Sequence, residues 1–291
     1  MTQNDEVPDW VAVTRRNARS VQTTIGWVYF DPGAEKRLET LGLPGKLGYI
    51  AGRAAPLGPA GPEAVVAAFG SISPLGVAIA LDLVAKHTTF DAVWAARDAA
   101  VLDGLTDYAP DIKPLLVSYG PALWEVVDQL PRLGRVFFAA HLRMARPVDP
   151  VLSGWHAINC LREWRGDTHW AVIAAAGLDG PEASILHNAW VGYEKDWMPS
   201  SRGSTPEETE AAWSRLEQKG LAIDGKVTRG AVELRQRIED DTDELTALPW
   251  QLAGKELALR FADEFEPPCE KLLARVDVTA GSNYQPASRI H

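Results

Sequence analysis

Five ionisable side chains lie within eight residues in the run from Arg162 to His169, and residues 162–170 read Arg-Glu-Trp-Arg-Gly-Asp-Thr-His-Trp. A neutral histidine beside a carboxylate can act as a general base, and closely spaced arginines can hold an anionic group through paired hydrogen bonds. We therefore predict a ligand site in this run. The predicted catalytic residues are His169, Asp167 and Glu163, and the predicted ligand-binding residues are Arg162, Arg165, Trp164 and Trp170.

The elements that position this run are predicted to be two helices that meet at Gly166. An amphipathic helix over 151–161 leads into the run, Gly166 ends it, and Asp167 or Thr168 caps the next helix. His169 then lies in a first helical turn, where the helix dipole lowers the pKa of an imidazole and favours its neutral form. A structural alternative stays open, because arginine–carboxylate pairs often pin a helix junction.

A second polar region is the Gly/Pro/Ala-rich loop over 52–61, which contains Arg53 and leads to a helix predicted to begin at Pro62. Free N–H groups at a helix start and one arginine can bind an anion, although a plain connector explains the same residues. The sequence has 11 tryptophans, of which Trp190 and Trp197 fall in a later loop over 187–203. These two indoles are predicted to bind the ligand with Arg53 across a common cleft, and the alternative is that the tryptophans fill the core.

Composition narrows the class of protein. The chain has 291 residues, 46% of them hydrophobic, which is enough for one large domain or two ordinary ones. No apolar run reaches membrane-spanning length, the polar start of the chain does not read as a secretory signal, and two distant cysteines form no disulfide framework. We therefore expect a cytoplasmic protein. The histidines lack metal-ligand spacing, so no metal site is predicted, and no motif names a cofactor.

Glycine and proline divide the chain into helical segments, so the predicted fold is mainly α. Thr205-Pro206 is predicted to begin a helix that ends at Gly220. Two short strands around Asp224-Gly225 then form a hairpin, and Thr228 caps a long helix. Helix, hairpin and helix in this order are the winged-helix pattern, and a helix–turn–helix is predicted before it over 170–190.

Short matches at a nearly constant spacing suggest an internal duplication. We expect two divergent winged-helix-like halves, residues 13–130 and 131–285, related by a pseudo-twofold axis, with flexible tails over 1–12 and 286–291. The alternative is one irregular helical domain. A duplicated chain is expected to be a monomer shaped like a dimer, or a homodimer. The matching pairs are Gly42-Leu43-Pro44-Gly45 with Gly177-Leu178-Asp179-Gly180, Pro62-Glu63 with Pro206-Glu207, Ala92-Val93 with Ala231-Val232, and Pro110 with Pro249.

Three segments together resemble an actinobacterial family of MarR-like helix-turn-helix proteins, most of them uncharacterised. The segments are the run 162–169, the stretch 53–58, and Thr242-Asp243-Glu244-Leu245 with Pro249-Trp250. The resemblance covers nearly the whole chain and implies a winged helix-turn-helix fold. In that family the run usually reads Arg-Glu-His-Arg-Gly-Asp-Gly-His, whereas Trp164 and Thr168 depart from it here. The resemblance therefore does not imply a two-histidine metal site in this chain.

Charge decides between the candidate functions. The formal net charge is −10, and the helix predicted after Thr205 carries four glutamates against Arg215 and Lys219, which disfavours contact with phosphates. We favour a small-molecule-binding protein or enzyme on a repurposed MarR-like winged-helix scaffold, with the ligand in an aromatic cleft between the halves. The alternative is a DNA-binding transcriptional regulator that responds to a small ligand. A non-catalytic partner protein comes third.

Overall fold

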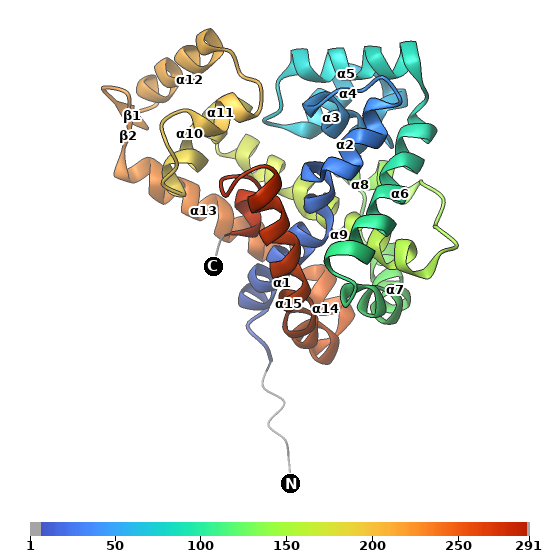
Figure 1. The fold of residues 1–291 in the computed structure, drawn as a ribbon. Helices are drawn as coiled ribbons and strands as arrows, with labels where there is room; N and C mark the ends of the chain where they lie inside the picture. Colours follow the sequence, from blue (N-terminus) through green and yellow to red (C-terminus); the bar gives the residue numbers. More distant parts are fainter. Residues whose placement is uncertain (1–6, 290–291) are drawn as a thin grey trace.

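The computed structural model describes residues 7–289, which fold almost entirely into helices (Figure 1), so the expected mainly α fold is confirmed. Labels α and η denote α-helices and 3-10 helices. The first part of the chain forms α1 (Trp10–Gly26), η1 (Trp27–Phe30), α2 (Pro32–Glu39), α3 (Lys46–Ala54), η2 (Gly58–Ala60), α4 (Pro62–Phe69), α5 (Pro74–His87), α6 (Phe90–Tyr108) and α7 (Ile112–Gln129). The second part forms α8 (Val136–Leu142), α9 (Pro150–Ala175), α10 (Gly180–Trp190), α11 (Trp197–Ser201), α12 (Pro206–Gln218), the strands β1 (Ala222–Ile223) and β2 (Lys226–Val227), α13 (Arg229–Leu245), α14 (Leu248–Ala253), α15 (Lys255–Thr279) and η3 (Pro286–Ser288).

The helices form a shared base with two lobes above it (Figure 1). One lobe contains α2–α5, and the other contains α10–α12 with the β1–β2 hairpin. The base contains α1, α7, α9, α14 and α15, and its apolar core draws buried side chains from both parts of the chain, from Val21 to Val276. Each lobe adds a smaller core of its own. None of the described helices is both long and apolar enough to cross a membrane.

The predicted helix–hairpin–helix segment is present where the sequence indicated it. Thr205 Oγ1 accepts the N–H of Glu208 at 3.2 Å, and the Glu208 carboxylate accepts the Thr205 N–H, so both sides of a capping box start α12. Asp224 and Gly225 join β1 to β2 with φ angles of 49° and 67°, the left-handed pair that a two-residue hairpin turn requires. Thr228 caps α13 by accepting the Ala231 N–H.

The helix–turn–helix before this segment is also present. Helix α9 ends at Ala175, and Gly177 turns the chain with a φ of 73°, a conformation that glycine adopts without steric cost. Asp179 then caps α10 through the N–H of Glu182, whose own carboxylate accepts the Asp179 N–H. The turn therefore places α10 against α12 and α13.

Three local predictions were wrong. Gly166 does not separate two helices, because α9 runs without interruption from Pro150 to Ala175. Helix α9 packs against α1, α7, α8 and α13, and this burial outweighs the weak helix propensity of one glycine. Arg53 lies in the last turn of α3 instead of a loop, and Trp190 and Trp197 belong to α10 and α11.

The predicted tails are shorter than expected. Helix α1 begins at Trp10, inside the predicted tail over 1–12. At the other end, η3 covers Pro286–Ser288, and Ser288 is buried with its carbonyl accepting Arg19 Nε. Residues 1–6 and 290–291 lie outside the described residues.

Helices α7 and α9 cross in close contact in the base. Gly120 and Gly154 face each other there, and a Cβ on Gly154 would lie 2.0 Å from the carbonyl oxygen of Leu116. Two glycines let the backbones approach to a distance that no side chain permits. This close packing fixes the position of α9 in the base, and α9 contains the polar run 162–169.

Gly154→Ala should destabilise the protein, because backbone must move to admit the methyl group. We expect the free energy of unfolding to fall by about 1–3 kcal/mol, the usual cost of overpacking, measured by urea denaturation. Gly230→Ala is the control, since a Cβ at this exposed helical position meets only Thr228 Oγ1 at 4.0 Å. Equal losses of unfolding free energy in both variants would contradict the conclusion that the packing of α7 on α9 requires glycine at position 154.

Candidate functional site

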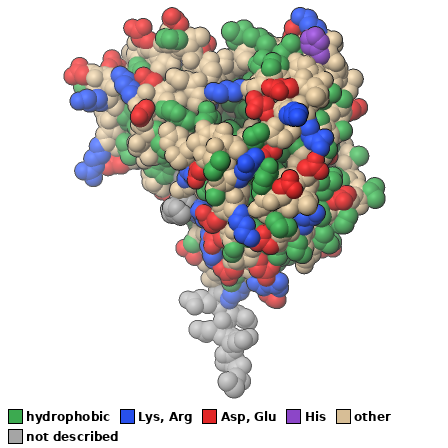
Figure 2. Space-filling view, viewed as in Figure 1, with side chains coloured by type: hydrophobic (Ala, Val, Ile, Leu, Met, Phe, Trp, Pro, Cys, Tyr) green, Lys and Arg blue, Asp and Glu red, His purple; other side chains and the backbone are tan. Residues whose placement is uncertain are grey.

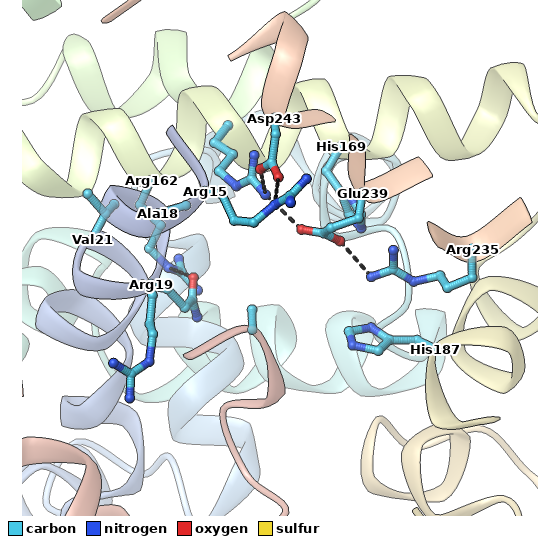
Figure 3. A pocket seen from close by; sticks show the side chains of 14 residues that line it. Arg15, Ala18, Arg19, Val21, Arg162, His169, His187, Arg235, Glu239 and Asp243 are labelled. Carbon is cyan, nitrogen blue, oxygen red and sulfur yellow. Dashed lines mark hydrogen bonds and ion pairs between the residues drawn. The ribbon is translucent and has the colours of Figure 1, made fainter. Parts of the chain in front are cut away.

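A cavity of about 140 Å³ lies between α1, α9, α10 and α13, close to η3 (Figure 3). Five arginines, two carboxylates and two histidines line it, so its wall is unusually rich in charge. The lining residues are Arg15, Ala18, Arg19, Val21, Gln22, Arg162, Arg165, Gly166, His169, His187, Arg235, Glu239, Asp243 and Ala287.

The carboxylates of α13 hold three of these arginines in place. Arg165 contacts Glu239 at 2.7 Å and Asp243 at 2.8 Å. Arg15 contacts Asp243 at 2.8 Å from α1, and Arg235 contacts Glu239 at 2.8 Å within α13. Burial opposes ionisation of Glu239, but His169, Arg165 and Arg235 together hold its pKa well below the usual range. The network therefore ties α1, α9 and α13 together around the cavity.

On the other side of the cavity, Arg162 donates to Gln22 Oε1 at 2.9 Å and to the Glu163 carboxylate. Glu163 also accepts Arg53 Nη2 at 2.8 Å and Nε at 3.3 Å. Burial raises the pKa of Glu163, but the two guanidiniums outweigh it and bring the pKa to about 2. Glu163 is therefore ionised and joins α3 to α9.

His169 reaches the cavity as a neutral imidazole of defined tautomer. Thr242 Oγ1 donates its one hydrogen to the Ile238 carbonyl at 2.6 Å, so it accepts from His169 Nδ1 at 3.0 Å. The Nε2 atom is therefore left as an acceptor. Burial lowers the pKa of His169 to about 3, so the imidazole is neutral, as predicted. The predicted cause was wrong, because His169 lies within α9 and not in the first turn of a helix.

Three polar atoms on cavity-lining side chains lack a hydrogen-bond partner among the described residues. One of them, Asp243 Oδ1, forms an ion pair with Arg165 at 2.8 Å. The other two are Arg235 Nη1 and His187 Nε2, on side chains that are only 2% and 8% exposed. Trp190 supports both side chains: the Arg235 guanidinium lies 4.6 Å from its ring centroid, and the His187 ring packs edge-on against it. A buried donor without a partner costs about 1–3 kcal/mol. These atoms therefore mark the place where a ligand group completes the wall.

The three predicted catalytic residues do not share one site, because His169 lines the cavity and Asp167 and Glu163 do not. Asp167 points away from it and accepts the Phe138 N–H at 2.8 Å, so it caps α8 and not α9. Burial is the main cause that raises the pKa of Asp167 to about 7, with a smaller contribution from Glu163. Glu163 is engaged in ion pairs with Arg53 and Arg162. Neither carboxylate is placed to orient His169, whose ring is held by Thr242.

Of the predicted ligand-binding residues, Arg162 and Arg165 line the cavity, whereas Arg53 lies behind Glu163 and stacks on Phe69 and Phe137. The four predicted tryptophans do not line it either. Their contacts are Trp164 with the Pro131 carbonyl and Arg135, Trp170 with Gly70 and His169, Trp190 with Gln236 and Arg235, and Trp197 with Tyr193 and Tyr284.

Sequence reasoning missed the residues of α1 and α13. The acidic run Glu239–Glu244 has the composition of a solvated helix face, but Glu239, Thr242 and Asp243 are buried. A signal was available, because Arg235, Glu239 and Asp243 recur every four residues and so share one helix face. His187 and the two α1 arginines, Arg15 and Arg19, carried no comparable signal.

A second buried polar cluster lies between α6, α8 and α9. Arg97 is stacked on Trp94, with its guanidinium carbon 3.3 Å from the ring centroid, and its Nη1 has no partner. His141, His156 and Asn159 also present unpartnered atoms there. Burial lowers the pKa of His141 to about 4. Among the described residues, no group of three or more histidines, cysteines and acids is arranged to hold a metal ion.

Comparison with known protein families identifies the family of this chain. The model of a helix-turn-helix family matches residues 14–279. The chain belongs to this helix-turn-helix family. No curated protein and no solved structure matches the chain.

In many helix-turn-helix proteins, one helix reads the DNA major groove. In this helix-turn-helix protein, the corresponding candidate is α12, and acidic side chains gather on its outer surface (Figure 2). Its two cations are engaged elsewhere: Arg215 contacts Asp179 at 2.6 Å, and Lys219 contacts Glu182 at 2.6 Å. The exposed acids of α12 are Glu207, Glu208, Glu210 and Glu217.

The raised pKa of Asp167 predicts a pH-dependent stability. The folded protein holds this proton more tightly than the unfolded chain, so the contribution of Asp167 is fully present below its unfolded pKa of 3.8 and is lost as the pH rises to about 7. Asp167→Asn cannot ionise but still accepts the Phe138 N–H. We expect the variant to match the wild type near pH 4 and to exceed it above about pH 7.5 by up to roughly 4 kcal/mol, since each pKa unit of difference between the folded and unfolded states corresponds to about 1.4 kcal/mol, in urea denaturation. A difference that does not vary with pH would contradict this.

Proposed function

We propose that this protein binds a small anionic molecule in the cavity between α1, α9, α10 and α13. The observation that carries the proposal is the pair of unpartnered atoms, Arg235 Nη1 and His187 Nε2, on buried side chains at the cavity wall. Each of the five lining arginines has a carboxylate partner, but Arg162 shares Glu163 with Arg53, so the wall keeps an excess of positive charge that favours an anion. The volume is close to the ~150 Å³ of a cavity that holds one benzene ring, so the ligand is small.

The wall supports binding better than it supports catalysis. The lining residues include no hydroxyl, thiol or amine nucleophile. His169 is a weak base with a pKa of about 3, far below the range in which a general base works best at neutral pH. Its Nε2 can instead accept a hydrogen bond from a ligand hydroxyl or amide, which adds selectivity.

DNA binding by a MarR-like winged-helix regulator is the second candidate, because the chain belongs to a helix-turn-helix family. The surface of α12 argues against it, since four exposed glutamates would face phosphates. The hairpin adds Lys226, and Arg229 beside it contacts Glu233 at 2.8 Å. We therefore rank ligand binding first and DNA contact second.

We also propose that the chain is a duplicated, dimer-shaped monomer with the ligand between the halves. The packing pairs support this: α1 packs against α15, and α9 packs against α7. If α1 corresponds to α9 and α7 to α15, a twofold axis exchanges these two pairs. The halves differ at the hairpin, since only Thr88 and Thr89 join α5 to α6 in the first half, and α14 between α13 and α15 has no counterpart between α6 and α7.

Arg235→Gln should weaken ligand binding, because it removes the charge and the free donor from the wall. Isothermal titration with butyrate, benzoate, glutarate and inorganic phosphate as probes should find at least one that binds the wild type. We expect the variant to bind that probe at least tenfold more weakly, equivalent to ~1.4 kcal/mol.

The matched control is Arg229→Gln on the same helix, whose side chain is 93% exposed and far from the cavity wall. It should bind as the wild type does. The proposal fails if none of the probes binds, or if Arg235→Gln and Arg229→Gln have equal affinity. Uptake of a DNA duplex that weakens steeply with salt would favour the regulator instead.

Gly166→Ala separates stability from binding. A Cβ at Gly166 meets nothing nearer than Glu163 Oε2 at 3.7 Å, so the helix accepts it, and alanine should raise the free energy of unfolding by about 0.5–1 kcal/mol. Gly166 lines the cavity, so the same methyl group should reduce affinity for the bound probe. Unchanged affinity in a stabilised variant would show that the ligand does not use this part of the cavity.

A further inference from the structure

The charges around the cavity fall into a neutral middle and two positive ends. The middle is the network on α13, in which each guanidinium is matched by a carboxylate. Its contacts connect Arg15, Arg165 and Arg235 with Asp240, Asp243 and Glu239.

The first positive end is at Arg162. This guanidinium lines the cavity and shares a single carboxylate, Glu163, with Arg53. Two cations against one anion leave one positive charge in excess. All three side chains are largely buried, with exposures of 1–11%, so water screens this excess poorly.

The second positive end is at Arg202, which follows α11. Its Nη1 donates to Ser184 Oγ at 3.0 Å, and no carboxylate among the described residues forms an ion pair with it. Ser184 and His187 lie three residues apart on one face of α10, so Arg202 lies near His187 and helps to lower its pKa, although it does not itself line the cavity. Burial lowers the pKa of Arg202 to about 10, and repulsion from Arg235 and Arg53 contributes to this.

The two ends lie across the open space from each other. Figure 3 shows Arg162 on the side of α1, and His187 with Arg235 on the opposite side. Clustered buried cations without matching anions are costly, and the second end also carries the unpartnered Arg235 Nη1 and His187 Nε2. The arrangement therefore calls for negative charge at two separate points.

We propose that the ligand is a dianion with its two acidic groups at opposite ends, such as a short dicarboxylate. One carboxylate lies against Arg162, and the other lies against Arg235 and His187, with the charge of Arg202 behind them. Arg202 is then a specificity-determining residue that selects ligands with a second carboxylate. A cavity of this volume accepts a chain of about four to six carbon atoms. This inference rests on the proposed function, because it concerns the same cavity.

The test compares glutarate, butyrate and inorganic phosphate by isothermal titration. The wild type should bind glutarate at least tenfold more tightly than butyrate, because only glutarate reaches both ends. Arg202→Gln should bring the two carboxylates to within about threefold of each other. Arg202→Lys, which keeps the charge, should retain a preference for glutarate, and it also serves if the Gln variant does not fold. Arg229→Gln should behave as the wild type does.

The possible failures are distinct. Equal affinities of glutarate and butyrate for the wild type would overturn the dianion and leave the proposed function standing. Phosphate binding more tightly than glutarate would also overturn it, since phosphate concentrates its charge at one point. A glutarate preference that survives in Arg202→Gln would remove Arg202 from the site. If none of the three anions or benzoate binds, the proposed function itself fails.

Discussion

Buried arginines must be matched by buried acceptors, and the centre of this molecule is organised around that requirement. A guanidinium cannot lose its proton near neutral pH, so a buried guanidinium stays charged and needs hydrogen-bond acceptors around it. Arg165 binds both Glu239 and Asp243 from a neighbouring helix. Arg53 and Arg162 converge on Glu163. The pairs made by Arg165 and Arg53 join helices that are far apart in the sequence, so the same contacts that neutralise charge also fix the arrangement of α3, α9 and α13.

Local signals gave the elements of the second lobe reliably. Thr205 and Thr228 each begin a helix as predicted, because a cap is decided within three or four residues. The turn at Asp224-Gly225 is equally local. Gly166 misled for the opposite reason: whether a glycine interrupts a helix depends on what packs around it, and the neighbours of α9 come from segments that no local pattern connects.

The candidate site was only partly predictable. The run 162–169 did contribute Arg162, Arg165 and His169 to one cavity. Asp167 and Glu163 face elsewhere because successive residues of a helix point about 100° apart, so a dense run must divide among several faces. The rest of the wall comes from α1, α10 and α13, and the contact of these helices is a property of the tertiary fold. Arg202 could not be recognised from the sequence, since what distinguishes it is the lack of a nearby carboxylate.

The unbroken course of α9 has a mechanical consequence. Its 26 residues extend for about 39 Å at 1.5 Å per residue, and its only proline is Pro150 in the first turn, so nothing along the rod acts as a hinge. Its middle borders the cavity, while it packs against α1 and α7 in the first part of the chain and against α8 and α13 in the second. A shift of α9 is therefore passed to both parts of the chain. Helix α9 therefore moves as one rigid unit, and a ligand in the cavity contacts it along residues 162–169.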